Sequence, residues 1–150
     1  MDKIFLKFSH PWWAEDVTGF GFLWSEEERK NDNTGWLSGV ICFHPINKKS
    51  SILRGFILGE AARHMETLPT KELIEGFNYL FEKFLGSTFT ISSIQVCLTS
   101  KWYQDSHFRG SYSCRLMKTE EADVKARDLA EPVCNVEGLP VGFFYILIPL

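Results

Sequence analysis

Residues 36–59 read WLSGVICFHPINKKSSILRGFILG, two apolar segments joined by a short polar linker. Both segments, 36–46 and 51–59, contain the β-branched and aromatic residues that favour strands. The linker NKKS at 47–50 is short and polar, which suits a tight connection between adjacent strands. The stretch therefore predicts an antiparallel hairpin, and the rest of the fold can be built around it.

Three further segments predict strands: KIFLKF (3–8), GFGFLWS (19–25) and ISSIQVCLTS (91–100). In the first of these, Ile4, Leu6 and Phe8 alternate with Phe5, so one face of that strand is apolar. The segment 25–35 is charged and rich in turn-forming residues, and it predicts a solvent-exposed loop.

The clearest helix is predicted at 70–85, where apolar residues recur at spacings of three and four. Thr70 is the candidate N-cap and Gly86 the candidate C′ residue. A shorter helix is predicted at 60–66, directly after Gly59. Strands joined by hairpins, followed by two helices and a strand, predict an α+β fold with a largely antiparallel mixed sheet and flanking helices.

Composition limits what the chain can be. Its 150 residues are enough for one domain, and 15% of them are aromatic, which predicts large buried surfaces. The formal net charge of −3 gives no electrostatic reason to expect nucleic acid or an anionic membrane as a partner. The start of the chain does not resemble a signal peptide, and the apolar last eleven residues are too short for a spanning helix. We therefore expect an intracellular protein.

Several kinds of chemistry find no support in the sequence. The four cysteines and four histidines are not spaced as metal ligands, and no G-x-S-x-G motif is present. GFGF lacks the third glycine of a nucleotide-binding loop, so its glycines more simply permit close packing or a bulge. Trp12 and Trp13 could form an aromatic platform, but we favour a wedge between a strand end and the core. His44 and His64 are best explained as hydrogen-bonded structural residues.

The segment KWYQDSHFRGSYS (101–113) fits neither a strand nor a helix. Trp102 follows a predicted strand, Gly110 lets the backbone approach another group closely, and Tyr112 stands between two serines. Such a segment could close a core, or it could form the wall of a site for a flat cofactor or substrate. The residues alone leave both alternatives open.

The pattern W-x-x-x-x-x-F-R-G-S-Y-S, with LAEPV (129–133) about twenty residues later, resembles the flavin-containing amine oxidases, and the polyamine oxidases in particular. KIFLKFSHPWW (3–13) and GFILGEAARHME (55–66) resemble two further passages of that family. The resemblance implies that residues 1–141 are a partial substrate-side domain and that 142–150 form a divergent apolar tail.

The resemblance also implies a cofactor and a reaction. Trp102 would lie beside FAD, and Gly110, Ser111 and Tyr112 would pass its isoalloxazine ring. Ser111 stands where monoamine oxidases carry the cysteine that bonds the flavin, so FAD would be held non-covalently. Tyr112, the implied catalytic residue, would form one wall of an aromatic cage around the amine. The implied reaction is hydride transfer from spermine, spermidine or their N1-acetyl forms to the flavin, with O2 reduced to H2O2.

The sequence also departs from this family. It carries no G-x-G-x-x-G, the flavin-proximal lysine has no counterpart, and the family pattern ends after Val141. We therefore expect a fragment, inactive alone, that exposes surface able to pair with a missing FAD-binding domain or a full-length paralogue. The alternative is a non-catalytic binding or regulatory fragment. The expected location is cytoplasmic or peroxisomal, with no nucleic-acid or membrane partner.

Overall fold

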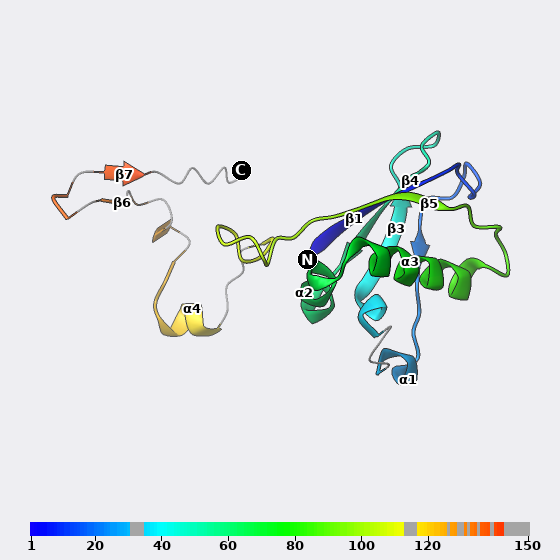
Figure 1. The fold of residues 1–150 in the computed structure, drawn as a ribbon. Coiled ribbons are helices and arrows are strands. Elements are labelled where there is room, and N and C mark those ends of the chain that lie inside the picture. The colour runs from blue at the N-terminus through cyan, green and yellow to red at the C-terminus, as the bar shows by residue number, and fades with distance from the viewer. Residues whose placement is uncertain are drawn as a thin grey trace. The chain divides into compact units, whose positions relative to one another are not determined.

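The computed structural model describes residues 1–30, 35–112, 117–125, 127–128, 131, 133–134, 136–138 and 140–142. The chain divides into two compact units, Met1–Tyr112 and Ser113–Leu150. The first unit contains a five-stranded sheet with helices packed against it (Figure 1). The described part of the second unit contains one short helix, α4 (Met117–Glu121), and a small antiparallel pair, β6 (Val133–Cys134) and β7 (Pro140–Gly142).

The strands of the first unit are β1 (Asp2–Phe8), β2 (Phe20–Gly21), β3 (Val40–Pro45), β4 (Ile52–Ile57) and β5 (Ile94–Thr99). Their order across the sheet is β2-β3-β4-β1-β5, and each of these neighbouring pairs is antiparallel. The predicted hairpin is confirmed, with His44 opposite Arg54 and Pro45 opposite Leu53. The α+β class is confirmed, whereas the expected parallel component of the sheet is not found among the described strands.

The helices of the first unit are α1 (Glu26–Arg29), the 3-10 helix η1 (Gly35–Gly39), α2 (Gly59–Thr67) and α3 (Thr70–Leu85). The predicted loop at 25–35 is wrong in part, because Ser25 starts α1 with a capping box. Its hydroxyl accepts from the Glu28 amide at 3.3 Å, and the Glu28 carboxylate accepts from the Ser25 amide at 2.9 Å. The strand predicted at 36–46 is also too long, since its first residues belong to η1.

Helix α3 has the predicted bounds, but both predicted caps are wrong. Pro69 occupies the N-cap position, and no side chain accepts a hydrogen bond there. Gly86 is the C-cap itself, with φ of −60°, rather than a left-handed C′ residue. The apolar periodicity of α3 was therefore sufficient to predict the helix, whereas its ends depend on neighbouring segments.

Helix α3 lies across one face of the sheet and buries its apolar side there (Figure 1). The ring of Phe81, fully buried, lies 5.8 Å from that of Phe8 on β1 and 5.1 Å from that of Phe43 on β3. Trp12 and Trp13 contact the Phe8 ring edge-on at 5.7 and 5.8 Å. The wedge predicted for the two tryptophans is confirmed.

The other face of the sheet carries a mixture of basic and apolar side chains. The strand register places on it Lys3, Phe5, Lys7, Arg54, Phe56, Val96 and Leu98, which we call the open face. Val96 is 41% exposed and Leu98 62% exposed, and both belong to the outermost strand β5. The two faces of the sheet therefore differ sharply in how well their apolar residues are covered.

Candidate functional site

The predicted site residues lie in the segment that follows β5, at the end of the sheet where β1 begins. Trp102 is half-buried, and the ring of Phe108 packs edge-on against it at 5.2 Å. The amide of Gly110 donates to the carbonyl of Trp102 at 3.0 Å. The segment 102–110 is thus a loop closed upon itself, and we call it the Trp102 loop.

Asp2, only 2% exposed, ties the start of this loop to the sheet. Its Oδ1 accepts from the Ser100 hydroxyl at 2.7 Å and from the Trp102 amide at 3.3 Å. The Lys3 amide donates to the same Ser100 hydroxyl at 2.9 Å. Because β1 is the strand next to β5, these bonds fix the loop where it leaves the sheet.

Glu66, 1% exposed, ties the next residues of the loop to the end of α2. One carboxylate oxygen accepts from the Tyr103 amide at 2.9 Å, and the other accepts from the Gln104 amide at 2.8 Å. From the same helix, the Arg63 guanidinium lies 4.2 Å from the centre of the Tyr103 ring. Helix α2 therefore holds the loop by charge-assisted hydrogen bonds and by a cation–π contact.

A small cavity of about 130 Å³ lies between the loop, the start of β1 and α2. Its lining residues are Met1, Asp2, Gly59, Ala62, Arg63, Trp102, Tyr103, Arg109 and Gly110. An indole and two guanidinium groups suit a flat or anionic group. The volume is well below the roughly 300–1,000 Å³ typical of a pocket that encloses a small molecule, so this cavity by itself does not enclose one.

Two of the four predicted site residues, Trp102 and Gly110, therefore line one cavity. A Cβ added to Gly110 would meet nothing within 4 Å, so the backbone there borders open space. Ser111 is half-buried and Tyr112 is 75% exposed, and neither lines this cavity. Ser113, the last residue of the motif, lies outside the described residues.

Sequence reasoning missed the two carboxylates that hold the loop. Glu66 was visible only as the last residue of GFILGEAARHME, and Asp2 only as the residue before an alternating strand. Acidic residues at such positions are usually exposed. The signal that could have identified Glu66 is its position four residues after the apolar Ala62, which puts both side chains on the same side of the helix, and Ala62 is only 2% exposed.

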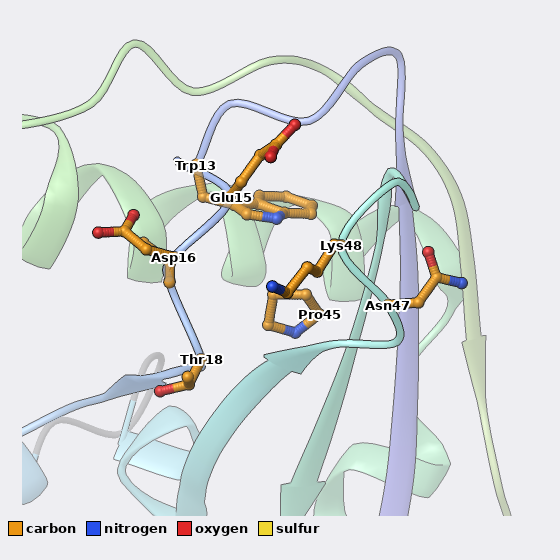
Figure 2. A pocket seen from close by; sticks show the side chains of 8 residues that line it. Trp13, Glu15, Asp16, Thr18, Pro45, Asn47 and Lys48 are labelled. Atoms are coloured by element: carbon orange, nitrogen blue, oxygen red, sulfur yellow. The ribbon is translucent and has the colours of Figure 1, made fainter.

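A larger cavity of about 500 Å³ lies at the opposite end of β1, next to the β3–β4 turn (Figure 2). Trp13, Glu15 and Asp16 line it from one side, and Pro45 at the end of β3 and Lys48 in the turn line it from the other (Figure 2). Trp13 is only 8% exposed, so its ring serves mainly as core. This cavity contains none of the predicted site residues.

The interpretation of His44 as a structural residue is confirmed, since its Nδ1 lies 2.8 Å from the Thr18 carbonyl. A Cβ at Gly19 would collide with the same imidazole ring, which is the close packing expected of a glycine in GFGF. The structural hydrogen bond expected for the His64 ring is not found among the described residues, although the backbone carbonyl of His64 accepts from the Thr67 hydroxyl at 2.7 Å.

The thiols of Cys42 and Cys97, both partly buried, are not activated. Burial raises the pKa of Cys97 to about 11, and burial likewise raises the pKa of Cys42. Both thiols therefore stay protonated near neutral pH. Among the described residues, no group of three His, Cys, Asp or Glu side chains could hold a metal ion. In the same part of the chain, no helix is both long and apolar enough to cross a membrane.

Residues 1–140 match the sequence profile of the flavin containing amine oxidoreductases. The match covers nearly the whole chain, including β1, β5 and α2, the elements that position the Trp102 loop. The chain belongs to this family.

Relatives with known names point to one branch of the family. The chain is 28% identical over 119 residues to the bovine peroxisomal N(1)-acetyl-spermine/spermidine oxidase and 27% identical over 139 residues to the human protein of that name. It is 26% identical over 98 residues to polyamine oxidase 1 of Oryza sativa subsp. japonica. These alignments cover 75%, 88% and 65% of this chain, but only 23%, 27% and 19% of the relatives. The chain thus spans about a quarter of the length of its bovine and human relatives.

Proposed function

We propose that this chain supplies the flavin-facing wall of an FAD-dependent polyamine oxidase. The observation that carries the proposal is the meeting of Trp102 and Gly110 at one cavity, on a loop anchored by two buried carboxylates. Family membership implies a flavin, and the names of the relatives favour spermine, spermidine or their N1-acetyl forms as substrates. Since two of those relatives are named as peroxisomal, a peroxisomal location is proposed ahead of a cytoplasmic one.

The residues present fit one side of a flavin ring. Trp102 offers a flat apolar surface, and the open space at Gly110 leaves room for a ring close to the backbone. Bound FAD would supply hydride acceptance from the amine and electron transfer to O2. Ser111 cannot form the thioether link of a cysteine, so the flavin would be held non-covalently. Exposed Tyr112 would face the amine and help to exclude water from it.

We further propose that the chain alone does not catalyse this reaction. A cavity of about 130 Å³ cannot enclose a flavin, and Tyr112, the proposed catalytic residue, stands 75% exposed instead of within a closed site. A second protein surface would therefore be required to complete the site.

The experiment that tests both statements uses the purified 150-residue chain. FAD is titrated while flavin fluorescence is followed, and H2O2 release is measured with spermine and N1-acetylspermine. We expect weak flavin binding, lowered in Trp102→Phe and unchanged in Tyr79→Phe, whose ring is exposed on α3, with no H2O2 release. Turnover by the chain alone would overturn the proposed inactivity. Equal FAD affinity in the Trp102→Phe variant would overturn the proposed flavin wall.

The open face favours a second candidate function, that of a non-catalytic fragment which binds a full-length polyamine oxidase. The face combines exposed Leu98 and Val96 with basic Lys3, Lys7 and Arg54, and it includes no acidic side chain. A partner surface with apolar and acidic residues would complement it. Co-purification of the tagged chain with a full-length polyamine oxidase, lost in Leu98→Glu but kept in the matched variant Leu23→Glu, would support this function. Leu23 is 92% exposed and lies outside the open face. A monomer that binds no oxidase would contradict it.

A further inference from the structure

Three consecutive backbone amides at the start of the Trp102 loop all donate to carboxylates. The Trp102 amide donates to Asp2, and those of Tyr103 and Gln104 donate to the two oxygens of Glu66. An irregular segment must satisfy its amides with water, with other backbone or with side chains. Here both acceptors are charged and almost fully buried, at 2% and 1% exposure.

Burying a carboxylate is costly unless strong hydrogen bonds compensate for the lost water. Asp2 obtains them from Ser100 and Trp102, and Glu66 obtains them from Tyr103 and Gln104. The loop amides therefore stabilise the buried carboxylates, and the carboxylates in turn satisfy the loop amides. A displaced loop would leave Glu66 buried without these two donors and Asp2 with the Ser100 hydroxyl alone, so this loop position is strongly favoured over alternatives.

The two carboxylates stand on rigid and separate elements. Asp2 begins the inner strand β1, which is paired on both sides. Glu66 lies near the end of α2, one residue after the fully buried Met65. The loop is consequently fixed to the sheet at Trp102 and to the helix at the next two residues. Such a two-point attachment sets the orientation of the indole as well as its position.

We infer that Asp2 and Glu66 are positioning residues, which hold the Trp102 loop so that the indole keeps one orientation at the cavity. The inference rests on the proposed function in one respect only, that the fixed indole would serve as a flat surface beside a flavin ring. It also assigns a role to the final glutamate of GFILGEAARHME. Neither carboxylate lies within hydrogen-bonding reach of a reacting atom in this proposal, so neither is a catalytic residue.

The test compares Glu66→Gln with the parent chain in the absence of flavin. Glutamine keeps the size of the side chain but replaces one acceptor oxygen with an NH2 group that faces a backbone N–H. We expect amide hydrogen exchange at Tyr103 and Gln104 to accelerate about 10- to 100-fold, the loss expected for a charged hydrogen bond. Glu72→Gln, on the exposed side of α3, is the matched control and should change neither amide.

A spectroscopic signature separates positioning from general stabilisation. In chains labelled with 5-fluorotryptophan, the five tryptophans give separate 19F resonances, and Trp102→Phe identifies the one of interest. We expect Glu66→Gln to shift or broaden only the Trp102 resonance while the four core tryptophan signals stay unchanged. An unchanged Trp102 resonance together with parent-like exchange would overturn the inference.

A second pair of variants covers the case in which Glu66→Gln fails to fold. Asp2→Ala should accelerate exchange at the Trp102 amide, and Asp2→Asn, which keeps an acceptor oxygen, should restore most of the protection. Failure of Asp2→Ala to alter the Trp102 amide would overturn the role of Asp2. These measurements need no flavin, whereas the FAD titration tests the proposed function. If the loop loosens without loss of FAD affinity, the proposal that Trp102 contacts the flavin is contradicted, whereas the positioning role of Asp2 and Glu66 still holds.

Discussion

The two ends of the sheet each have a tryptophan-containing segment that follows a strand, yet the two segments are held in opposite ways. After β1, Trp12 and Trp13 pack into a cluster of rings, with centroid distances to Phe8 of 5.7 and 5.8 Å. After β5, Trp102 packs against the ring of Phe108, and its loop depends on hydrogen bonds to buried carboxylates. The end with Trp12 and Trp13 is part of an apolar core, whereas at the other end hydrogen bonds hold the loop that carries Trp102.

The difference shows why an aromatic residue after a strand does not by itself indicate a site. The indole Nε1 of Trp12 is buried without a hydrogen-bond partner, a cost that the surrounding rings offset. Trp102 is only half-buried and borders a cavity. The environment of each tryptophan depends on segments that are distant in the sequence. Trp12 packs against the Phe81 ring of α3, whereas the Trp102 loop is held by carboxylates from β1 and α2.

The largest effect is expected at the aromatic end. Phe81→Ala removes a fully buried ring that contacts Phe8, Trp12 and Phe43. We expect the free energy of unfolding, measured by urea titration, to fall by about 3–5 kcal/mol. Phe108→Ala, at a ring that is 62% exposed, is the matched control and should cost less than about 1 kcal/mol. Equal losses would show that the two ends are not different in kind.

An intermediate effect is expected at the polar end. Ser100→Ala removes the hydroxyl that donates to Asp2 at 2.7 Å, and it leaves that carboxylate with fewer donors. We expect a loss of about 1.5–3 kcal/mol in the free energy of unfolding, together with faster amide exchange at Trp102.

The control for this variant is Ser93→Ala, just before the other end of β5, where the hydroxyl bonds only to the exposed Gln95 side chain. It should change the free energy of unfolding by no more than about 0.5 kcal/mol. A loss in Ser93→Ala as large as that in Ser100→Ala would mean that the buried carboxylate is not what makes Ser100 important.

The smallest effect is expected away from both ends, at the ion pair between Glu28 and Lys83. A hydrogen bond from Lys83 lowers the pKa of Glu28 from 4.5 to about 2. Because the folded state binds its proton more weakly, this contribution is complete above about pH 4.5 and is lost as the pH falls toward 2. We expect the free energy of unfolding to fall slightly less between pH 4.5 and pH 2 in Glu28→Gln than in the parent chain. The measurement is the unfolding free energy of both proteins as a function of pH. Parallel titrations would contradict this.

The parts of the fold that the sequence predicted are those in which one residue pattern decides. Alternation fixes the buried side of β1, and the spacing of apolar residues fixes α3. The errors fall where a competing interaction decides. Ser25 starts a helix because Glu28 completes its capping box. Residues 36–39 form part of a 3-10 helix in place of the predicted strand, and this helix buries Trp36 and Leu37. Such local alternatives have similar intrinsic propensities, so the surrounding structure decides between them.

The candidate site divides in the same manner. Trp102 and Gly110 were predicted from a resemblance to the family, and the structure brings them to one cavity. Asp2 and Glu66 could not be predicted from spacing, because they meet the loop across about 100 and 37 positions of sequence. The orientation of Tyr112 as a cage wall stays a prediction.

The position of β1 between β4 and β5 has a consequence for the synthesis of the protein. Its register partner on one side, β5, begins only at Ile94, whereas β4 begins at Ile52. At about 5–20 residues per second on the ribosome, roughly 5–20 s pass between the emergence of β1 and that of β5. During that interval the edge of β1 that will pair with β5 has no partner strand. The nascent chain would then be most open to chaperones, and most exposed to mispairing, before β5 emerges.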